Sequence, residues 1–165
     1  MTESIHNLIN ALREELQQYG EMLALLDRQQ ESVTSRAADD VFQSVSLIQA
    51  QGAAIQQARR RREECRRIVA QEATLPADAT FAKLIPALQS AYRPLVGALV
   101  DENNALLVRV QQRARQNHLL LMRSVEFMQN LLNTLLPTRE TRVYNGQGAM
   151  QTHFATPRSR YEAVG

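Results

Sequence analysis

The sequence of 165 residues has little of what sheets, disulfides and cofactor sites require. Aromatic residues make up 5% of it, tryptophan is absent, and there are only six glycines and five prolines. Leu, Ala, Gln, Glu and Arg dominate, and these residues favour helices over strands. The length suits one domain with a real core. We therefore expect an all-α protein.

Reactive residue types are equally scarce. The single cysteine, Cys65, excludes an intrachain disulfide, and no Cys/His cluster has metal-ligand spacing. Gly-rich phosphate loops, nucleophile elbows and His-Glu-x-x-His motifs are absent. A phosphotransfer role for His118 is an alternative that its neighbours do not favour, because Leu119 to Met122 lack the Lys and Gly of such sites. We expect no enzyme, no metal and no cofactor.

The chain also lacks membrane and secretion signals. No uninterrupted run of about 18 apolar residues occurs, which argues against membrane insertion. The N-terminal residues contain neither a basic region nor an apolar stretch of the kind found in signal peptides. The sequence therefore predicts a cytoplasmic location.

A heptad pattern opens the chain, formed by Ile5, Leu12, Tyr19, Leu26 and Val33. It predicts an amphipathic helix over residues 3–34, a polar turn at 32–36 and a second helix over 37–73. The short turn makes the two helices antiparallel neighbours, in which facing residue numbers sum to about 72. Tyr19 then faces Gly52, and we expect the glycine to leave room for the tyrosine ring.

Prolines divide the next part of the chain. They predict a short helix near 79–91 and a long one over 94–136. The fold class is an elongated antiparallel bundle of three long, coiled-coil-like helices with a short extra helix and a C-terminal tail. Residues 1–136 form the bundle domain, and residues 137–165, which have no usable periodicity, form a flexible C-terminal tail.

An arginine-rich segment, residues 59–67, is the obvious nucleic-acid candidate. Its arginines go all round the helix, however, and the net charge of the chain is only +2. We favour a solvated helix with ion pairs to Glu63 and Glu64 and to Glu14 or Glu15 across the hairpin, and we expect no nucleic-acid partner. A surface for a protein partner is the other alternative.

The end of the long helix, residues 119–136, holds too many apolar residues for one helical stripe. Either a partner helix binds this segment, or the short helix or a second copy of the chain covers it. A homodimer is thus left open. The residues expected to bind a client protein are Leu121, Val125, Met128, Leu131, Leu132, Leu135 and Leu136.

Short motifs in and after this helix complete the pattern. Asn103-Asn104-Ala105-Leu106-Leu107 lies inside the helix, and Tyr144-Asn145-Gly146-Gln147-Gly148 follows its Leu-rich end and Pro137. These features resemble the FlgN-type flagellar export chaperones, small helical proteins with a heptad-rich N-terminal hairpin. The matching motif residues are Asn103, Leu106, Leu107, Gly146 and Gly148. The prolines at 86 and 94 and the glycine order around Gln147 depart from the family pattern.

The resemblance implies a cytoplasmic chaperone that binds hook–filament junction proteins, which are flagellar hook-associated proteins. Such a chaperone prevents their premature assembly and delivers them to the flagellar type III export gate. Carried over to this chain, it implies docking at the gate through Tyr144 and client contact through Leu131, Leu132, Leu135 and Leu136. The rival hypothesis is a coiled-coil adaptor or scaffold that self-associates and has no chaperone activity.

Overall fold

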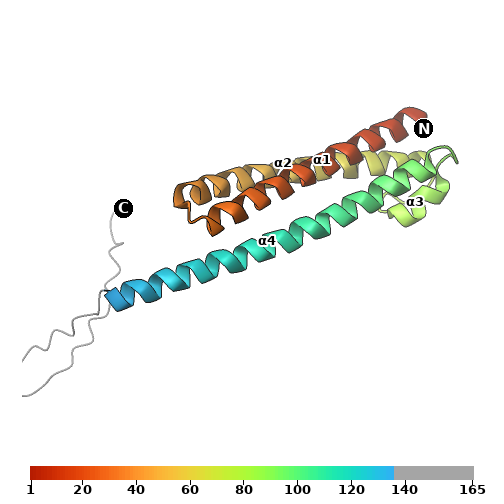
Figure 1. The fold of residues 1–165 in the computed structure, drawn as a ribbon. Helices are drawn as coiled ribbons and strands as arrows, with labels where there is room; N and C mark the ends of the chain where they lie inside the picture. The colour runs from red at the N-terminus through yellow and green to blue at the C-terminus, as the bar shows by residue number, and fades with distance from the viewer. Residues whose placement is uncertain (136–165) are drawn as a thin grey trace, which may run out of the picture. The chain divides into compact units, whose positions relative to one another are not determined.

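The computed structural model describes residues 1–135, which form four helices and no strand (Figure 1). They are α1 (Thr2–Thr34), α2 (Ala38–Glu72), α3 (Phe81–Ala87) and α4 (Arg93–Leu135). The all-α prediction is confirmed, and the three long helices begin and end within two residues of the expected positions. Met1–Val125 form one compact unit, and the chain from Glu126 belongs to a second unit, which is described by itself.

The short helix differs from its prediction: α3 spans 81–87 rather than 79–91. It carries Pro86 in its last turn, and Leu88 after it adopts extended backbone (φ −70°, ψ 160°). A proline clashes with the preceding helical turn and removes one of its hydrogen bonds, so Pro86 weakens this short helix. Pro94, by contrast, is the second residue of α4, where the first turn accepts a proline.

The hairpin of α1 and α2 has the expected antiparallel register. Gln29 Nε2 donates to Ser44 Oγ at 3.1 Å, and Gln51 Nε2 donates to the Gln18 carbonyl at 3.0 Å. Near the open end, Ser4 Oγ donates to a Glu72 carboxylate oxygen at 2.7 Å. The residue numbers of these pairs sum to between 69 and 76, around the predicted value.

Both hairpin helices end in the same way without glycine. Ala37 N–H donates to the Ser32 carbonyl, and Leu75 N–H donates to the Ala70 carbonyl. Such bonds define the Schellman motif, which requires a left-handed residue just past the helix. Arg36 and Thr74 take that conformation, with φ of 58° and 56°.

The proposed reason for Gly52 is wrong. A Cβ added at this glycine would meet no other atom within 4 Å, so no ring needs the space that the glycine leaves. The Tyr19 ring is buried instead with Met22, Leu26, Ile55 and Val110. The hairpin register therefore holds, but packing does not require a glycine at 52.

Within the compact unit α4 runs parallel to α1. Asn103 Nδ2 donates to the Leu12 carbonyl at 3.0 Å, and Asn117 Nδ2 donates to the Leu26 carbonyl at 2.7 Å. Both pairs are 91 residues apart, so the two helices keep one register over two heptads. The core is densest at the α3 end, where all four helices contribute to it: Ile5, Leu8, Ile9, Leu12, Val69, Ala70, Ala79, Leu84, Leu88, Val96 and Leu99.

Candidate protein-binding surface

The C-terminal part of α4, at the blue end of the helix in Figure 1, is rich in exposed apolar side chains. We call residues 119–132 the apolar end of α4. Its exposed members in the first compact unit are Leu119, Met122 and Val125, and those in the second are Phe127, Met128, Leu131 and Leu132. Their exposed fractions lie between 41% and 60%. Large patches of exposed apolar side chains are typical of interaction surfaces.

The expected client-binding residues are distributed as follows. Val125, Met128, Leu131 and Leu132 are exposed, whereas Leu121 is half-buried. Leu135 is the last residue of α4. Leu136, the docking residue Tyr144 and the motif glycines Gly146 and Gly148 lie outside the described residues. Their roles stay predictions.

Three further residues of the apolar end are exposed but were not among the expected client-binding residues: Leu119, Met122 and Phe127. Met122 is five residues beyond the buried Asn117, which places it about 140° round the helix from the α1 contact. Leu119, two residues beyond Asn117, lies about 200° round the helix axis from the same contact. The heptad seam directed attention to one face of α4, and these residues lie on another. Phe42 on α2, 76% exposed, was also missed.

The register shows how far α1 extends along α4. α1 ends at Thr34, and an offset of 91 places Thr34 opposite position 125 of α4. The heptad positions of α4 that have an α1 partner include Val96 and Val110, and both are buried. These two valines thus belong to the core of the compact unit, one in each hydrophobic cluster.

The charges along this part of α4 are mostly of one sign. Between Asn103 and Leu135 the sequence has four arginines and one acidic residue, Glu126. Arg113 pairs with α1, since its Nε lies 2.8 Å from Asp27 Oδ1. The other three, Arg109, Arg115 and Arg123, are exposed. An apolar surface with exposed arginines near it favours a partner with acidic residues.

The family-motif residues inside α4 belong to the core and not to this surface. Asn103 is buried and donates to carbonyls of both Leu12 and Leu99. Leu106 and Leu107 are half-buried and pack on the cluster around Tyr19. The motif therefore holds α4 on the hairpin.

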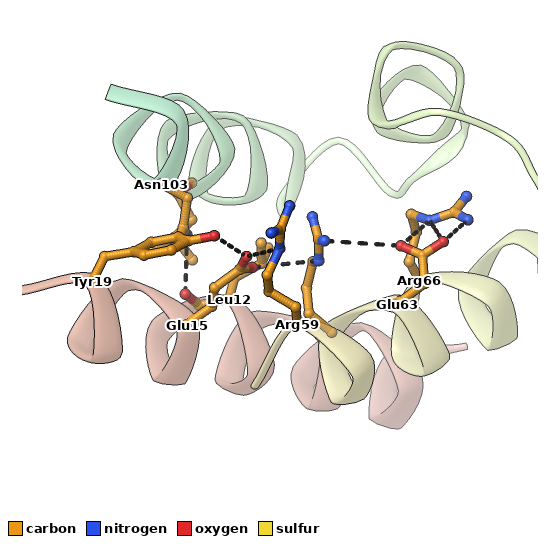
Figure 2. Close-up of polar contacts among 9 residues, drawn as sticks. Leu12, Glu15, Tyr19, Arg59, Glu63, Arg66 and Asn103 are labelled. Carbon is orange, nitrogen blue, oxygen red and sulfur yellow. Dashed lines mark hydrogen bonds and ion pairs between the residues drawn. The ribbon is translucent and has the colours of Figure 1, made fainter. Parts of the chain in front are cut away.

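The arginine-rich segment forms ion pairs, as predicted. Figure 2 shows the Glu15 carboxylate between Tyr19 and arginines of α2. Glu15 is only 3% exposed, and its oxygens lie 3.8 Å from Arg59 Nε and 3.3 Å from Arg62 Nε. Across the same hairpin Arg61 pairs with Glu14 at 2.9 Å. These arginines thus neutralise acidic residues of α1.

Two pKa values reflect this network. Burial raises the pKa of Tyr19 to about 12, and the hydrogen bond that its hydroxyl donates to Glu15, at 2.9 Å, adds to the rise. Arg66 donates to Glu63 and so holds the pKa of the Glu63 carboxyl below its usual value. Arg66 also donates to the Ala79 carbonyl and thereby ties α2 to the segment before α3.

The described residues offer few sites for other chemistry. Residues 1–135 contain no group of three or more His, Cys, Asp or Glu side chains placed to hold a metal ion. His118 is exposed on α4. None of the four helices is both long enough and apolar enough to cross a membrane. The described residues thus form an all-α fold whose longest helix ends in an exposed apolar segment.

A comparison with protein families identifies the particular class. The model of the family described as FlgN protein matches residues 1–152 of the chain. The chain therefore belongs to the FlgN family of flagellar export chaperones. No curated protein and no solved structure matches it.

Proposed function

We propose that this flagellar export chaperone binds hook–filament junction proteins in the cytoplasm through the apolar end of α4 and the residues after it. By covering their terminal helices it prevents premature assembly, and it then delivers them to the flagellar type III export gate. The observation that carries the proposal is the row of exposed apolar side chains from Leu119 to Leu132. Membership of the FlgN family supports it.

The exposed apolar area at the end of α4 is of a size that favours reversible binding of a partner. Fully burying a Leu, Met, Val or Phe side chain contributes about 1.5–3 kcal/mol, so side chains that are already half covered would contribute roughly 1 kcal/mol each. Seven such residues line the apolar end, and ordering the partner offsets part of the gain. Met122 and Met128 adapt readily to different neighbours.

The preferred partner is an amphipathic helix with acidic residues beside its apolar face. An apolar helix face binds a second helix through anchors at intervals of three and four residues. Exposed Arg115 and Arg123 would pair with carboxylates of that helix. Replacing both arginines by Gln should weaken binding severalfold and reduce its dependence on salt, measured by calorimetry at two ionic strengths. Unchanged affinity and salt dependence would remove the acidic residues from the proposal.

The binding surface itself is tested by placing a charge in it. Leu131→Asp and Leu132→Asp should each weaken binding of a junction protein's terminal segment more than tenfold, because a carboxylate would be buried against apolar atoms. Val108→Asp is the matched control, since Val108 is also an exposed apolar residue of α4 but lies before the apolar end. Equal losses in all three variants would contradict the site assignment.

Delivery to the gate is assigned to Tyr144. Tyr144→Ala should leave client binding within twofold of the parent but abolish capture by an export-gate component. A chain truncated after Pro137 should behave in the same way at the gate. If Tyr144→Ala binds the gate normally, the docking role is wrong while the client site stands.

A self-associating adaptor is the second candidate, and the exposed Phe42 on α2 favours it, because a second copy would cover that side chain. Light scattering separates the two candidates. A stable dimer that Phe42→Ser converts to a monomer, together with no binding of junction proteins, would support the adaptor. A monomer that binds a junction protein would support the chaperone.

A further inference from the structure

Two buried asparagines join α4 to α1. Asn103 and Asn117 are 6% and 1% exposed, and each donates its Nδ2 hydrogen to a main-chain carbonyl of α1, that of Leu12 or of Leu26. Figure 2 shows the first of these bonds. They are two heptads apart on α4, and Val110 occupies the heptad position between them. The seam thus alternates apolar and polar layers.

Stability alone does not account for asparagine at these two positions. The Oδ1 atoms of both are buried and accept a hydrogen bond from none of the described residues. A buried acceptor without a partner destabilises the folded state, and a leucine at either position would avoid that loss. In coiled coils a buried asparagine at a seam position is known to select one register at the expense of stability.

A polar network fixes which register is selected. Asn117 Nδ2 also donates to Gln29 Oε1 at 3.1 Å, and Gln29 Nε2 donates to Ser44 Oγ of α2. Asn117, Gln29 and Ser44 are all buried, so one chain of hydrogen bonds joins α4, α1 and α2. If α4 slipped by seven residues along α1, Asn117 would face Met22 or Arg36 in place of Gln29 and would lose this hydrogen bond.

Tyr19 opposes the same slips. Its ring fills the layer opposite Val110, and its hydroxyl is held by Glu15. After a slip of seven residues in one direction Asn103 would face Tyr19, and after a slip in the other direction Asn117 would face it. Either slip would therefore replace the apolar contact between Tyr19 and Val110 by a contact between the tyrosine ring and an asparagine.

We propose that Asn103 and Asn117 are register-determining residues, which hold α4 parallel to α1 at a single offset. The offset decides which α4 residues have no α1 residue opposite. A slip of seven residues would move that boundary from position 125 to 118 or to 132. On the proposed function, the two asparagines thereby set how much apolar helix the chaperone offers to its client.

Electron–electron distance measurements test the register. Spin labels at Asn10→Cys on α1 and Arg115→Cys on α4, both exposed positions, are combined with Cys65→Ser to remove the only native thiol. The parent should show one distance. Asn103→Leu/Asn117→Leu should show a second population, because a slip of seven residues translates a helix by roughly 10 Å along its axis. One unchanged distance in the double variant would overturn the proposal.

Single variants and a control sharpen the test. Asn103→Leu and Asn117→Leu each leave one asparagine in place and should keep the single distance. Asn104→Leu, at an exposed neighbouring position, should do the same. The double variant should also unfold at a higher denaturant concentration than the parent. Failure of the double variant to fold would overturn the proposal, since the asparagines would then supply stability.

Client binding is measured separately, so the two proposals can fail separately. If the parent binds no junction protein, the proposed function fails and the distance result still decides the register. If the double variant slips but binds the terminal segment as tightly as the parent, the register claim stands. Its link to the client surface is then wrong. A slip accompanied by at least tenfold weaker binding supports both.

Discussion

The two halves of α4 have nearly the same apolar content but opposite surroundings. In the first half Val96 and Leu99 are buried among residues of α1, α2 and α3. In the second half Leu131 and Leu132 are about half exposed. The heptad period does not change between them. Within the compact unit α1 lies along one face of α4 and ends at Thr34, opposite position 125.

This contrast separates two uses of apolar residues. A buried leucine stabilises the fold, whereas an exposed one in a continuous row provides a surface for another chain. Mutations in the first half should therefore change stability, and mutations in the second half should change binding.

The largest expected difference is between two leucines of the same helix. Leu99→Ala should lower the free energy of unfolding by about 2–5 kcal/mol, because it leaves a cavity in the core. Leu132→Ala should change it by at most about 0.5 kcal/mol, as is usual for exposed positions. Urea titrations of both variants measure the two values. Similar losses would show that a described or undescribed part of the chain covers Leu132, and the contrast between the halves would break down.

A pH titration tests the buried hydrogen bond between Tyr19 and Glu15 in the packed part of the molecule. The folded-state pKa of Tyr19 is about 12, above its ordinary value of 10.0, so the folded state holds this proton more tightly than the unfolded state. The resulting stability is fully present below pH 10 and is lost as the pH rises towards 12, by up to about 3 kcal/mol. Tyr19→Phe should remove most of this loss, which denaturation at pH 9 and pH 11.5 would detect. Client binding at neutral pH should stay the same.

A glycine of the hairpin offers the smallest effect. Gly52→Ala should raise the free energy of unfolding by about 0.5–1 kcal/mol, because alanine favours helix and a Cβ there meets no atom within 4 Å. Thermal unfolding measures it, with Gly20→Ala as the control, since that glycine also has open space around it. If Gly52→Ala lowered stability while Gly20→Ala did not, the prediction that the Tyr19 ring needs the glycine would be correct after all.

The long helices were predictable because heptads, prolines and polar turns are local signals. The hairpin register also followed from the turn position alone. The length of α3 could not be predicted in this way, because the helical pattern of the sequence continues to residue 91 whereas the helix ends at Ala87. Gly52 was misjudged because a position on a seam was assumed to be crowded, whereas the added Cβ has open space.

The binding surface was only partly predictable from the sequence. The excess of leucines left two alternatives, a partner surface or intrachain burial, and Val125, Met128, Leu131 and Leu132 are exposed in the described chain. Leu119 and Met122 could not be placed, because their outward direction depends on the pairing of Asn103 and Asn117 with α1. That pairing depends on contacts 91 residues apart, which no local pattern encodes.

Hydrogen–deuterium exchange of the full chain with and without a junction protein's terminal segment tests the central claim most directly. Binding should slow amide exchange in residues 119–135, and exchange in residues 93–117 should not change, because that half is already packed on the hairpin. Slower exchange confined to the α1–α2 hairpin, or no change along α4, would contradict the claim that its apolar end receives the client.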